Sequence, residues 1–321
     1  MNISILDYFN HDTGLKILFN EADYYIVENK NKNEPYQYFK SFDDMKKYDH
    51  LFIITPTFDA INFYNNKSHD VSPGFVDFLS NLLTFIKTNK FKSICFFDNY
   101  DYDYDPNIIF NIGNNNKSDF ENENIIFFKR NYSKNINYPN NVFSFPYTMF
   151  FQKSIIETIY NPLYLHNNIE KENRIFFCGS LFNHKDDLYG QYRNRIETMN
   201  KIKSKLNIFQ PYYLQNDIFL NEMMKSKYCL DLLGCGDPNF RTFEILTSGS
   251  LRIAERSPLK WNFQDDFCEE TYFDNENDLY EKIKKLENIP GLYDSCLNKQ
   301  KEIVNKYMNK EYLKNEIISK I

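Results

Sequence analysis

Uninterrupted apolar runs of strand length are the feature of this sequence that most restricts its fold. HLFIITPT (50–57), SICFFD (93–98) and NIIFFKR (124–130) lie in the first half, and RIFFCGS (174–180) and SLRIAE (250–255) in the second. A strand with one solvent-facing side alternates apolar and polar residues, whereas a strand of a parallel sheet covered on both faces is apolar throughout. The runs therefore predict parallel sheets enclosed by helices.

Segments with helical apolar spacing alternate with these runs. A short helix is expected over 14–22, between strands at 2–9 and 23–28, and a longer one over 72–90, where Pro73 favours a helix start. In the second half, helices are expected over 192–206, 216–227, 240–249 and 276–290, a strand over 228–234, and one or two helices over 292–321. Regular alternation of strands and helices is typical of α/β proteins.

The length of 321 residues supports two domains of about 150 residues each. The stretch YNPLYLHNNIEKEN (160–173) is the expected linker. We predict an α/β fold with two doubly wound, Rossmann-like domains, residues 1–160 and 161–321, that face a shared cleft. Sugar transferases, sugar-nucleotide epimerases, periplasmic-type binding proteins and some dehydrogenases share this architecture, so function has to be argued from the site.

Composition restricts the binding partners and the cellular location that are expected of the protein. The net charge of -6 without a long basic stripe disfavours duplex nucleic acid and anionic membranes as partners. No stretch approaches the ~18 to 20 apolar residues that span a bilayer, and the N-terminus lacks a signal peptide, so we expect a cytoplasmic protein without a transmembrane segment. The six cysteines form no C-x-x-C pair, which indicates neither a metal site nor a disulfide framework.

Arginine and glycine are scarce and clustered. Six of the seven arginines lie between positions 174 and 256, and five of the nine glycines lie between 179 and 249. Because lysine can replace arginine wherever only charge is needed, clustered arginines indicate forked hydrogen bonds to phosphate or carboxylate groups. The glycines indicate tight turns or close backbone approach. Chance clustering together with ordinary turns is the alternative.

The stretch SKYCLDLLGCGDPNFRTFEILTSGSLRIAER (226–256) is the most specific part of the sequence. A buried strand leads into a glycine-containing loop, and a helix begins near Arg241. The start of a helix offers unpaired N–H groups and a positive dipole end, which favour a diphosphate. Arg241 opposes that dipole, and phosphate binding would explain its presence there. Glu244, one turn along on the same face, either accepts hydrogen bonds from ribose hydroxyls or simply pairs with Arg241.

This stretch resembles the donor-site segment of GT-B glycosyltransferases of the group 1 superfamily, and it is most similar to exostosin-like and spore-coat-type members. The resemblance extends to RIFFCGS (174–180), their opening strand and glycine turn, and to YFDNENDLYEKIKKL (272–286), their closing strand and helix. More weakly, NIIFFKRNYSKN (124–135) and NVFSFPYTMF (141–150) are similar to the end of the acceptor-side domain. The match covers about 120 residues of the C-terminal half, and the N-terminal half only by layout.

The resemblance implies a hexosyl- or pentosyltransferase of glycan biosynthesis. Such an enzyme moves a sugar from a nucleotide sugar to a hydroxyl of a glycan, glycoconjugate or other acceptor, without a metal ion or other cofactor. Gly179 and Ser180 would approach the donor phosphates, and Arg193 or Arg195 would add a phosphate contact or belong to a solvated basic face. The expected donor-binding residues are Gly179, Ser180, Arg193, Arg195, Gly236, Arg241, Glu244 and Gly249. Gly236 stands where many members carry the second glutamate of a retaining mechanism.

Inversion of configuration would also require a base that deprotonates the acceptor hydroxyl. We expect this base from the N-terminal domain, from His11 or Asp12 in the turn after the first strand. Asp12 as a plain helix cap and His11 as a surface histidine are the alternatives. Asp98, at the end of the strand over 93–98, is a reserve candidate for the base or for acceptor contact.

Two alternative functions remain open from the sequence. Asp101, Asp103 and Asp105 have the D-x-D spacing with which GT-A glycosyltransferases hold a metal ion, although such short motifs are weak and leave the cluster at 174–256 unexplained. The other alternative is a non-catalytic carbohydrate- or nucleotide-binding protein with the same two-domain frame. Metal dependence of activity separates the first alternative from the GT-B hypothesis, and nucleoside diphosphate binding tests the second.

Overall fold

The structure is a computed structural model in which two compact units are found. They comprise Met1–Phe151 with Lys314–Ile321, and Gln152–Leu313. The described residues are 1–7, 14–27, 37–55, 73–98, 105–112, 117–120, 124–130, 132–145, 161–165, 169–179, 181, 195–211, 214–233, 240–257, 259–261 and 263–321. The sequence predicts a boundary after residue 160 and the last residues in the second domain, whereas 314–321 group with the first unit.

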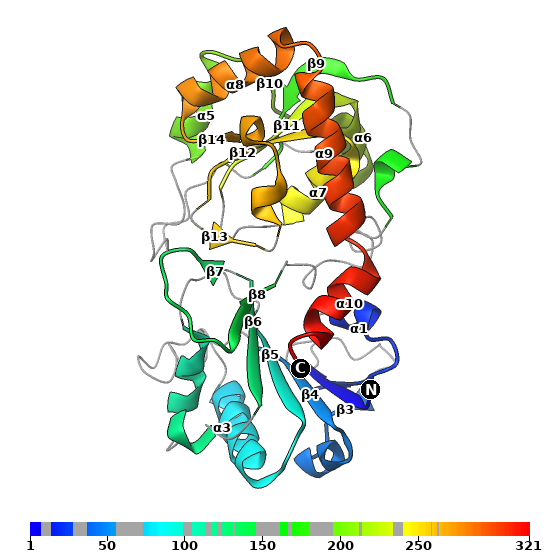
Figure 1. Ribbon diagram of the computed structural model, residues 1–321, viewed down its shortest axis with the longest axis vertical. Helices are drawn as coiled ribbons and strands as arrows, with labels where there is room; N and C mark the ends of the chain where they lie inside the picture. The colour runs from blue at the N-terminus through cyan, green and yellow to red at the C-terminus, as the bar shows by residue number, and fades with distance from the viewer. Residues whose placement is uncertain are drawn as a thin grey trace. The chain divides into compact units, whose positions relative to one another are not determined.

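The first unit is built on a parallel sheet with the strand order β3-β2-β1-β4-β5-β6-β8 (Figure 1). Its strands are β1 (Ile3–Asp7), β2 (Asp23–Ile26), β3 (Gln37–Tyr38), β4 (His50–Thr55), β5 (Ser93–Asp98), β6 (Ile125–Lys129) and β8 (Val142–Ser144). Every described residue of β1, β5 and β6 is buried, as the apolar runs predicted. Rings stack across the middle strands, with Phe96 and Phe127 5.1 Å apart between centroids.

Helices complete the first unit. They are α1 (Gly14–Leu18), α3 (Pro73–Thr88) and the short 3-10 turns η1 (Phe42–Lys47), η2 (Pro106–Asn111) and η3 (Lys117–Phe120). The apolar positions that predicted α3, among them Phe75, Leu79 and Leu82, are buried in one core cluster with β4, β5 and β6. The helical spacing in the sequence therefore marks the face that packs on the sheet.

The second unit carries a parallel sheet with the order β10-β9-β11-β12-β14. Its strands are β9 (Glu172–Phe176), β10 (Ile208–Phe209), β11 (Ser226–Asp231), β12 (Leu251–Glu255) and β14 (Tyr272–Phe273). In doubly wound sheets a ligand binds at the carboxyl ends of the strands where the strand order reverses. Here the order reverses between β9 and β11.

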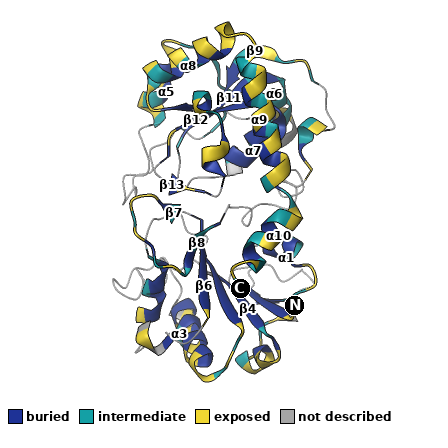
Figure 2. Cartoon of the chain, viewed as in Figure 1, coloured by how far each residue is buried: buried dark blue, intermediate teal, exposed yellow. Residues whose placement is uncertain are grey.

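Helices cover both faces of this second sheet. They are α5 (Arg195–Lys203), α6 (Asn216–Lys225), α7 (Phe240–Ser248), α8 (Glu276–Asn288) and α9 (Leu292–Tyr307). The last helix, α10 (Lys310–Ile318), groups with the first unit from Lys314 onwards. Residues of α5, α8 and α9 share one core cluster with the sheet, and residues of α6 and α7 share another. Figure 2 shows the same layering, with buried strands in dark blue and helices that are partly exposed, in yellow. None of the helices in the described part of the chain combines the length and apolar content needed to span a bilayer.

Candidate functional site

The exits of β9 and β11 bring two predicted site segments to the same edge of the second sheet. The two strands are parallel neighbours, so their carboxyl ends lie side by side. The turn with Cys178 and Gly179 follows β9, and the chain after β11 leads to the first turn of α7. This edge includes the point where the strand order reverses, the position at which α/β sheets bind ligands.

Arg241 and Glu244 form an ion pair on the first turn of α7. Arg241 Nη1 lies 3.2 Å from Glu244 Oε2, and the two side chains are 20% and 13% exposed. The Arg241 guanidinium also lies over the ring of Phe219 on α6, with its carbon 4.3 Å from the ring centroid. Stacking on an aromatic face orients an arginine fork while its edge remains able to bind an anion. Phe219 was not identified from the sequence, because α6 reads there only as an amphipathic helix.

Glu244 has an unusual environment for a carboxylate. Its Oε2 atom is buried and accepts no hydrogen bond from any residue in the described part of the chain, because the contact with Arg241 has ion-pair distance without hydrogen-bond geometry. Burial raises the pKa of Glu244, and the positive charge of Arg241 only partly opposes this rise. A buried acceptor of this kind gains most from a ligand that supplies hydroxyl donors.

The turn after β9 lies close to this ion pair. Cys178 packs in the same apolar cluster as Phe219, and burial raises the pKa of its thiol, while the charge of Arg241 lowers it and that of Glu244 raises it. A Cβ atom on Gly179 would lie 3.1 Å from the ring of Phe177, so the ring would have to yield to any larger residue. Gly179, Arg241 and Glu244 are thus brought to one place.

A second unpaired acceptor lies at the same sheet edge. Gln210 directly follows β10, which pairs with β9, and its Oε1 atom is buried without a hydrogen-bond partner among the described residues. Sequence reasoning missed this residue, since a two-residue strand such as Ile208–Phe209 leaves no readable pattern.

Arg195 holds the exit of β11. Its Nε donates to the carbonyl of Leu233 at 2.7 Å and its Nη2 to the carbonyl of Leu232 at 3.3 Å. The Leu233 N–H donates to the Glu255 carboxylate at 3.1 Å. The prediction placed Arg195 at the donor phosphates. The structure shows it at the backbone of the adjoining strand exit, where it binds the two residues that directly follow β11.

Gly249 lies at the opposite end of α7 from Arg241. Its φ of 77° is in the left-handed region, and a Cβ atom there would lie 2.6 Å from the Cβ of Tyr164. Glycine alone satisfies both conditions readily, and it is the usual residue that ends a helix in this way. The turn and the packing account for Gly249, whereas the prediction had placed it at the donor.

Asp98 ends β5 in the first unit, as predicted, but its side chain is enclosed. Its Oδ2 atom lies 3.0 Å from Lys129 Nζ at the end of the neighbouring strand β6, and both side chains are 0% exposed. In this structure the carboxylate is therefore the buried partner of an ammonium group and is not presented to solvent.

Several predicted residues lie outside the described residues. They are His11, Asp12, Ser180, Arg193 and Gly236, together with Asp101 and Asp103 of the D-x-D run. Asp105, the last residue of that run, is described, and its Oδ1 caps η2 by accepting from the Asn107 backbone N–H at 3.0 Å. In the parts of the chain that the structure describes, no three His, Cys, Asp or Glu residues gather where they could hold a metal ion.

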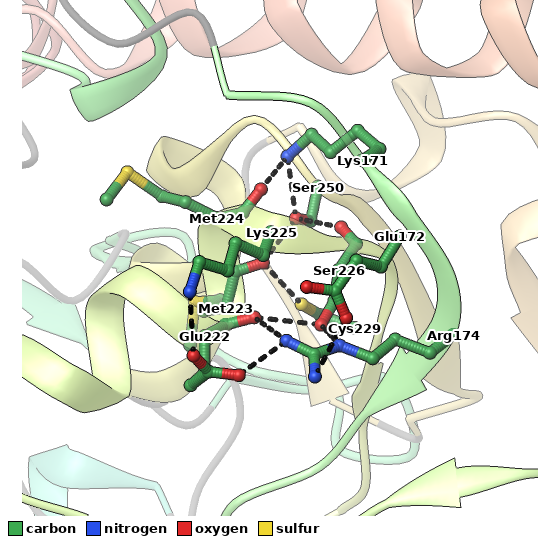
Figure 3. A network of polar contacts seen from close by, with 10 residues as sticks. All are labelled: Lys171, Glu172, Arg174, Glu222, Met223, Met224, Lys225, Ser226, Cys229 and Ser250. Carbon is green, nitrogen blue, oxygen red and sulfur yellow. Dashed lines mark hydrogen bonds and ion pairs between the residues drawn. The ribbon is translucent and has the colours of Figure 1, made fainter.

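Three other arginines of the cluster bind carboxylates within the protein. Arg174 binds Glu222 at 2.6 Å and Ser226 at 2.9 Å in a network at the start of β11, which Figure 3 shows together with Lys171 and Ser250. Burial lowers the pKa of that lysine to about 8. Arg252 binds Asp231, and Arg256 binds Glu269 and Asp274. The sequence predicts that arginines of the cluster bind anionic groups, and these three do so within the protein, each through single nitrogens to separate carboxylates.

Comparisons with known proteins identify the fold. A scan against protein-family models finds no match for the sequence, and neither does a search of curated proteins. Solved structures do match: T4 phage β-glucosyltransferase in complex with UDP-glucose is 15% identical, with a TM-score of 0.53 over 100% of this chain and 99% of that one. The UDP-forming α,α-trehalose-phosphate synthase from Burkholderia xenovorans is 9% identical, with a TM-score of 0.50 over 100% and 98%.

The chain has the GT-B fold. Another match, an α-glucosyltransferase in complex with UDP-glucose and DNA containing an abasic site, is 12% identical with a TM-score of 0.50 over 99% of this chain and 98% of that one. GT-B proteins have two Rossmann-like domains, which agrees with the two parallel sheets described above. The predicted fold class is confirmed.

Proposed function

We propose that this GT-B protein is a glycosyltransferase that transfers a sugar from a nucleotide-sugar donor to a hydroxyl of its acceptor. The observation that carries the proposal is the pair Arg241 and Glu244 on the first turn of α7. There a stacked guanidinium adjoins a buried carboxylate oxygen that accepts no hydrogen bond from the described residues. An anionic group with neighbouring hydroxyls, such as a nucleoside diphosphate, complements both. The sheet edge is also the position at which doubly wound folds bind nucleotides.

Each residue has a distinct part in this proposal. Arg241 and the helix start would stabilise the charge that develops on the leaving nucleoside diphosphate. Glu244 would accept hydrogen bonds from the ribose hydroxyls, and Gly179 and Ser180 would allow the phosphates to approach the backbone. His11 or Asp12 would act as the base of an inverting reaction. Hexosyl or pentosyl specificity, metal independence and exostosin-like character rest on the sequence motifs.

The proposed acceptor is a glycan or glycoconjugate. The net charge of -6 without a basic stripe argues against DNA. Among similar structures, however, T4 phage β-glucosyltransferase is described as a DNA-modifying enzyme. An acceptor assay should therefore compare oligosaccharides with DNA whose bases carry free hydroxyl groups, and incorporation of the donor sugar into DNA alone would overturn the glycan assignment.

Binding of nucleoside diphosphates tests the donor site. We expect titration calorimetry to detect UDP, GDP or ADP, and Arg241→Ala to weaken binding of that nucleotide by about 10- to 100-fold, since a charged hydrogen bond contributes about 1.5–3 kcal/mol. Arg256→Ala is the matched control, because Arg256 is 40% exposed and pairs with surface carboxylates. Absence of binding to all three nucleotides, or equal binding by wild type and Arg241→Ala, would contradict the proposal.

Turnover separates the alternatives. A panel of nucleotide sugars should reveal release of the nucleoside diphosphate, with unchanged rates after EDTA treatment. Loss of activity with EDTA and recovery with Mn²⁺ would contradict metal independence, although the GT-B fold already argues against a GT-A-type enzyme. Nucleotide binding without hydrolysis or transfer of any donor would favour a non-catalytic binding protein.

A further inference from the structure

Thr242 ties the first turn of α7 to the strand below it. The residue lies between Arg241 and Glu244 in sequence and is fully buried. Its Oγ1 donates to Asp231 Oδ2, at the end of β11, at 2.9 Å. Arg252 Nε donates to the same carboxylate oxygen at 2.6 Å, so one buried acceptor joins a helix and two strands.

Arg252 is held in place by aromatic rings. Its guanidinium carbon lies 5.6 Å from the ring centroids of Trp261 and Tyr272 and 5.9 Å from that of Phe267. Asp231 and Arg252 are each 4% exposed. A buried ion pair of this kind adds little net stability, because removal of both charges from water offsets their attraction. The three rings and the hydrogen bond to Asp231 nevertheless fix the orientation of the Arg252 guanidinium.

The neighbouring backbone is fixed as well. Arg195 of α5 binds two carbonyls just after Asp231, and Glu255 of β12 accepts the N–H of Leu233. The exit of β11 is thus held by hydrogen bonds with α5 and β12. The hydrogen bond from Thr242 to Asp231 joins α7 to this fixed strand end. Residues 241–244 span a single helical turn, so a hydroxyl anchored at 242 limits rotation and sliding of both Arg241 and Glu244.

We propose that Thr242 and Asp231 are positioning residues that set the geometry of Arg241 and Glu244 for a nucleoside diphosphate. This inference rests on the proposed function, because it assigns a task to the same helix turn. Misplacement of a binding group by about 1 Å has large effects on affinity and rate, and loss of such supporting contacts commonly lowers function by about 10- to 100-fold. Neither residue is required to touch the ligand.

The test compares two threonines of the same helix. Thr242→Val removes the hydroxyl that binds Asp231 and keeps the shape of the side chain. Thr247→Val is the matched control, because Thr247 is equally buried and, among the described residues, its hydroxyl binds the carbonyls of Phe243 and Glu244 within the helix. Thr242→Ser restores the hydroxyl. The readouts are the dissociation constants of UDP, GDP and ADP by calorimetry and the free energy of unfolding in urea.

We expect Thr242→Val to weaken binding of the preferred nucleotide about tenfold, Thr247→Val by less than about twofold, and Thr242→Ser to bind as the wild type does. If Thr242→Val does not fold, Thr242→Cys, a weak donor, replaces it and should lie between valine and serine. Equal affinities for Thr242→Val and wild type, or equal losses for both valine variants, would overturn the inference. Nucleotide binding by the wild type in the same experiment would still support the proposed function. A wild type that binds none of the nucleotides would overturn both.

Discussion

The folded chain disfavours the ionised form of Glu244. Burial raises its pKa, although Arg241 lies beside it. A carboxyl group with a higher pKa in the folded than in the unfolded state holds its proton more tightly when folded. It therefore stabilises the fold below its unfolded pKa, and this contribution is lost as the pH rises through the folded pKa. Ionisation of Glu244 in the folded chain therefore lowers the free energy of unfolding.

Replacement of Glu244 by glutamine should separate stability from binding. Because glutamine resembles the protonated side chain, we expect Glu244→Gln to have a higher free energy of unfolding than the wild type at pH 7, and the difference to shrink near pH 4. Affinity for the preferred nucleoside diphosphate should fall about tenfold, as for loss of one charged hydrogen bond. Urea denaturation at both pH values and calorimetry measure these effects.

Glu222 provides the opposite case. Its burial opposes ionisation, but hydrogen bonds from Arg174 and Lys225 outweigh this and lower its pKa. The stability that Glu222 contributes is present above the unfolded pKa and is lost as the pH falls through the folded pKa. Glu222→Gln should therefore be less stable than the wild type at pH 7.

For Glu244, the contradicting outcome is a Glu244→Gln protein that is also destabilised at pH 7. That result would show that the ion pair with Arg241 outweighs burial.

At the scale of elements, the ends of β5 and β6 are joined by a buried charge pair. Asp98 and Lys129 have no exposed surface, so removal of one partner leaves the other charged in the interior. We expect Lys129→Met to lower the free energy of unfolding by about 3–5 kcal/mol. Lys92→Met should lower it by at most about 1 kcal/mol, because the pair of Lys92 with Asp49 is 69% and 43% exposed.

Urea denaturation of the two variants decides the role of Asp98. A large difference supports a structural task for the Asp98 carboxylate. Equal stabilities would show that the pair contributes little to the fold and would return Asp98 to consideration as the base.

At the scale of the whole molecule, the last residues of the sequence pack with the first unit. Residues 314–321 group with the first unit. There Lys314 binds Glu21 at 2.5 Å and lies 5.4 Å above the ring of Phe19, and Ile317 is fully buried. The first unit therefore includes a segment that Gln152–Leu313 separate in the sequence from the rest of the unit.

Truncation of a single buried side chain tests this assignment. We expect Ile317→Ala to destabilise the first unit by about 2–5 kcal/mol, and Lys314→Ala, which breaks a partly exposed pair, by at most about 1 kcal/mol. Hydrogen exchange should show faster exchange in β1 and β4 of the Ile317→Ala protein. Faster exchange confined to β11 and β12 would assign the segment to the second unit instead.

Local patterns sufficed for much of the fold and for part of the site. Apolar runs predicted β4, β5 and β6 because burial on both faces is a local property of a strand. Arg241 and Glu244 could be paired from sequence because they lie one helical turn apart. Strand β10 was missed, since two residues have no periodicity.

Sequence alone thus determined which segments are buried, which helices are amphipathic and where a helix turn joins a cation to a carboxylate. Only the tertiary structure decided the partners of the remaining charges. Arg174 meets Glu222 from 48 residues away, Arg252 meets Asp231 from 21, and Asp98 meets Lys129 from 31. Such partners are set by strand order and register, which parallel sheets reach through long connections, so no short window of sequence contains both members of a pair.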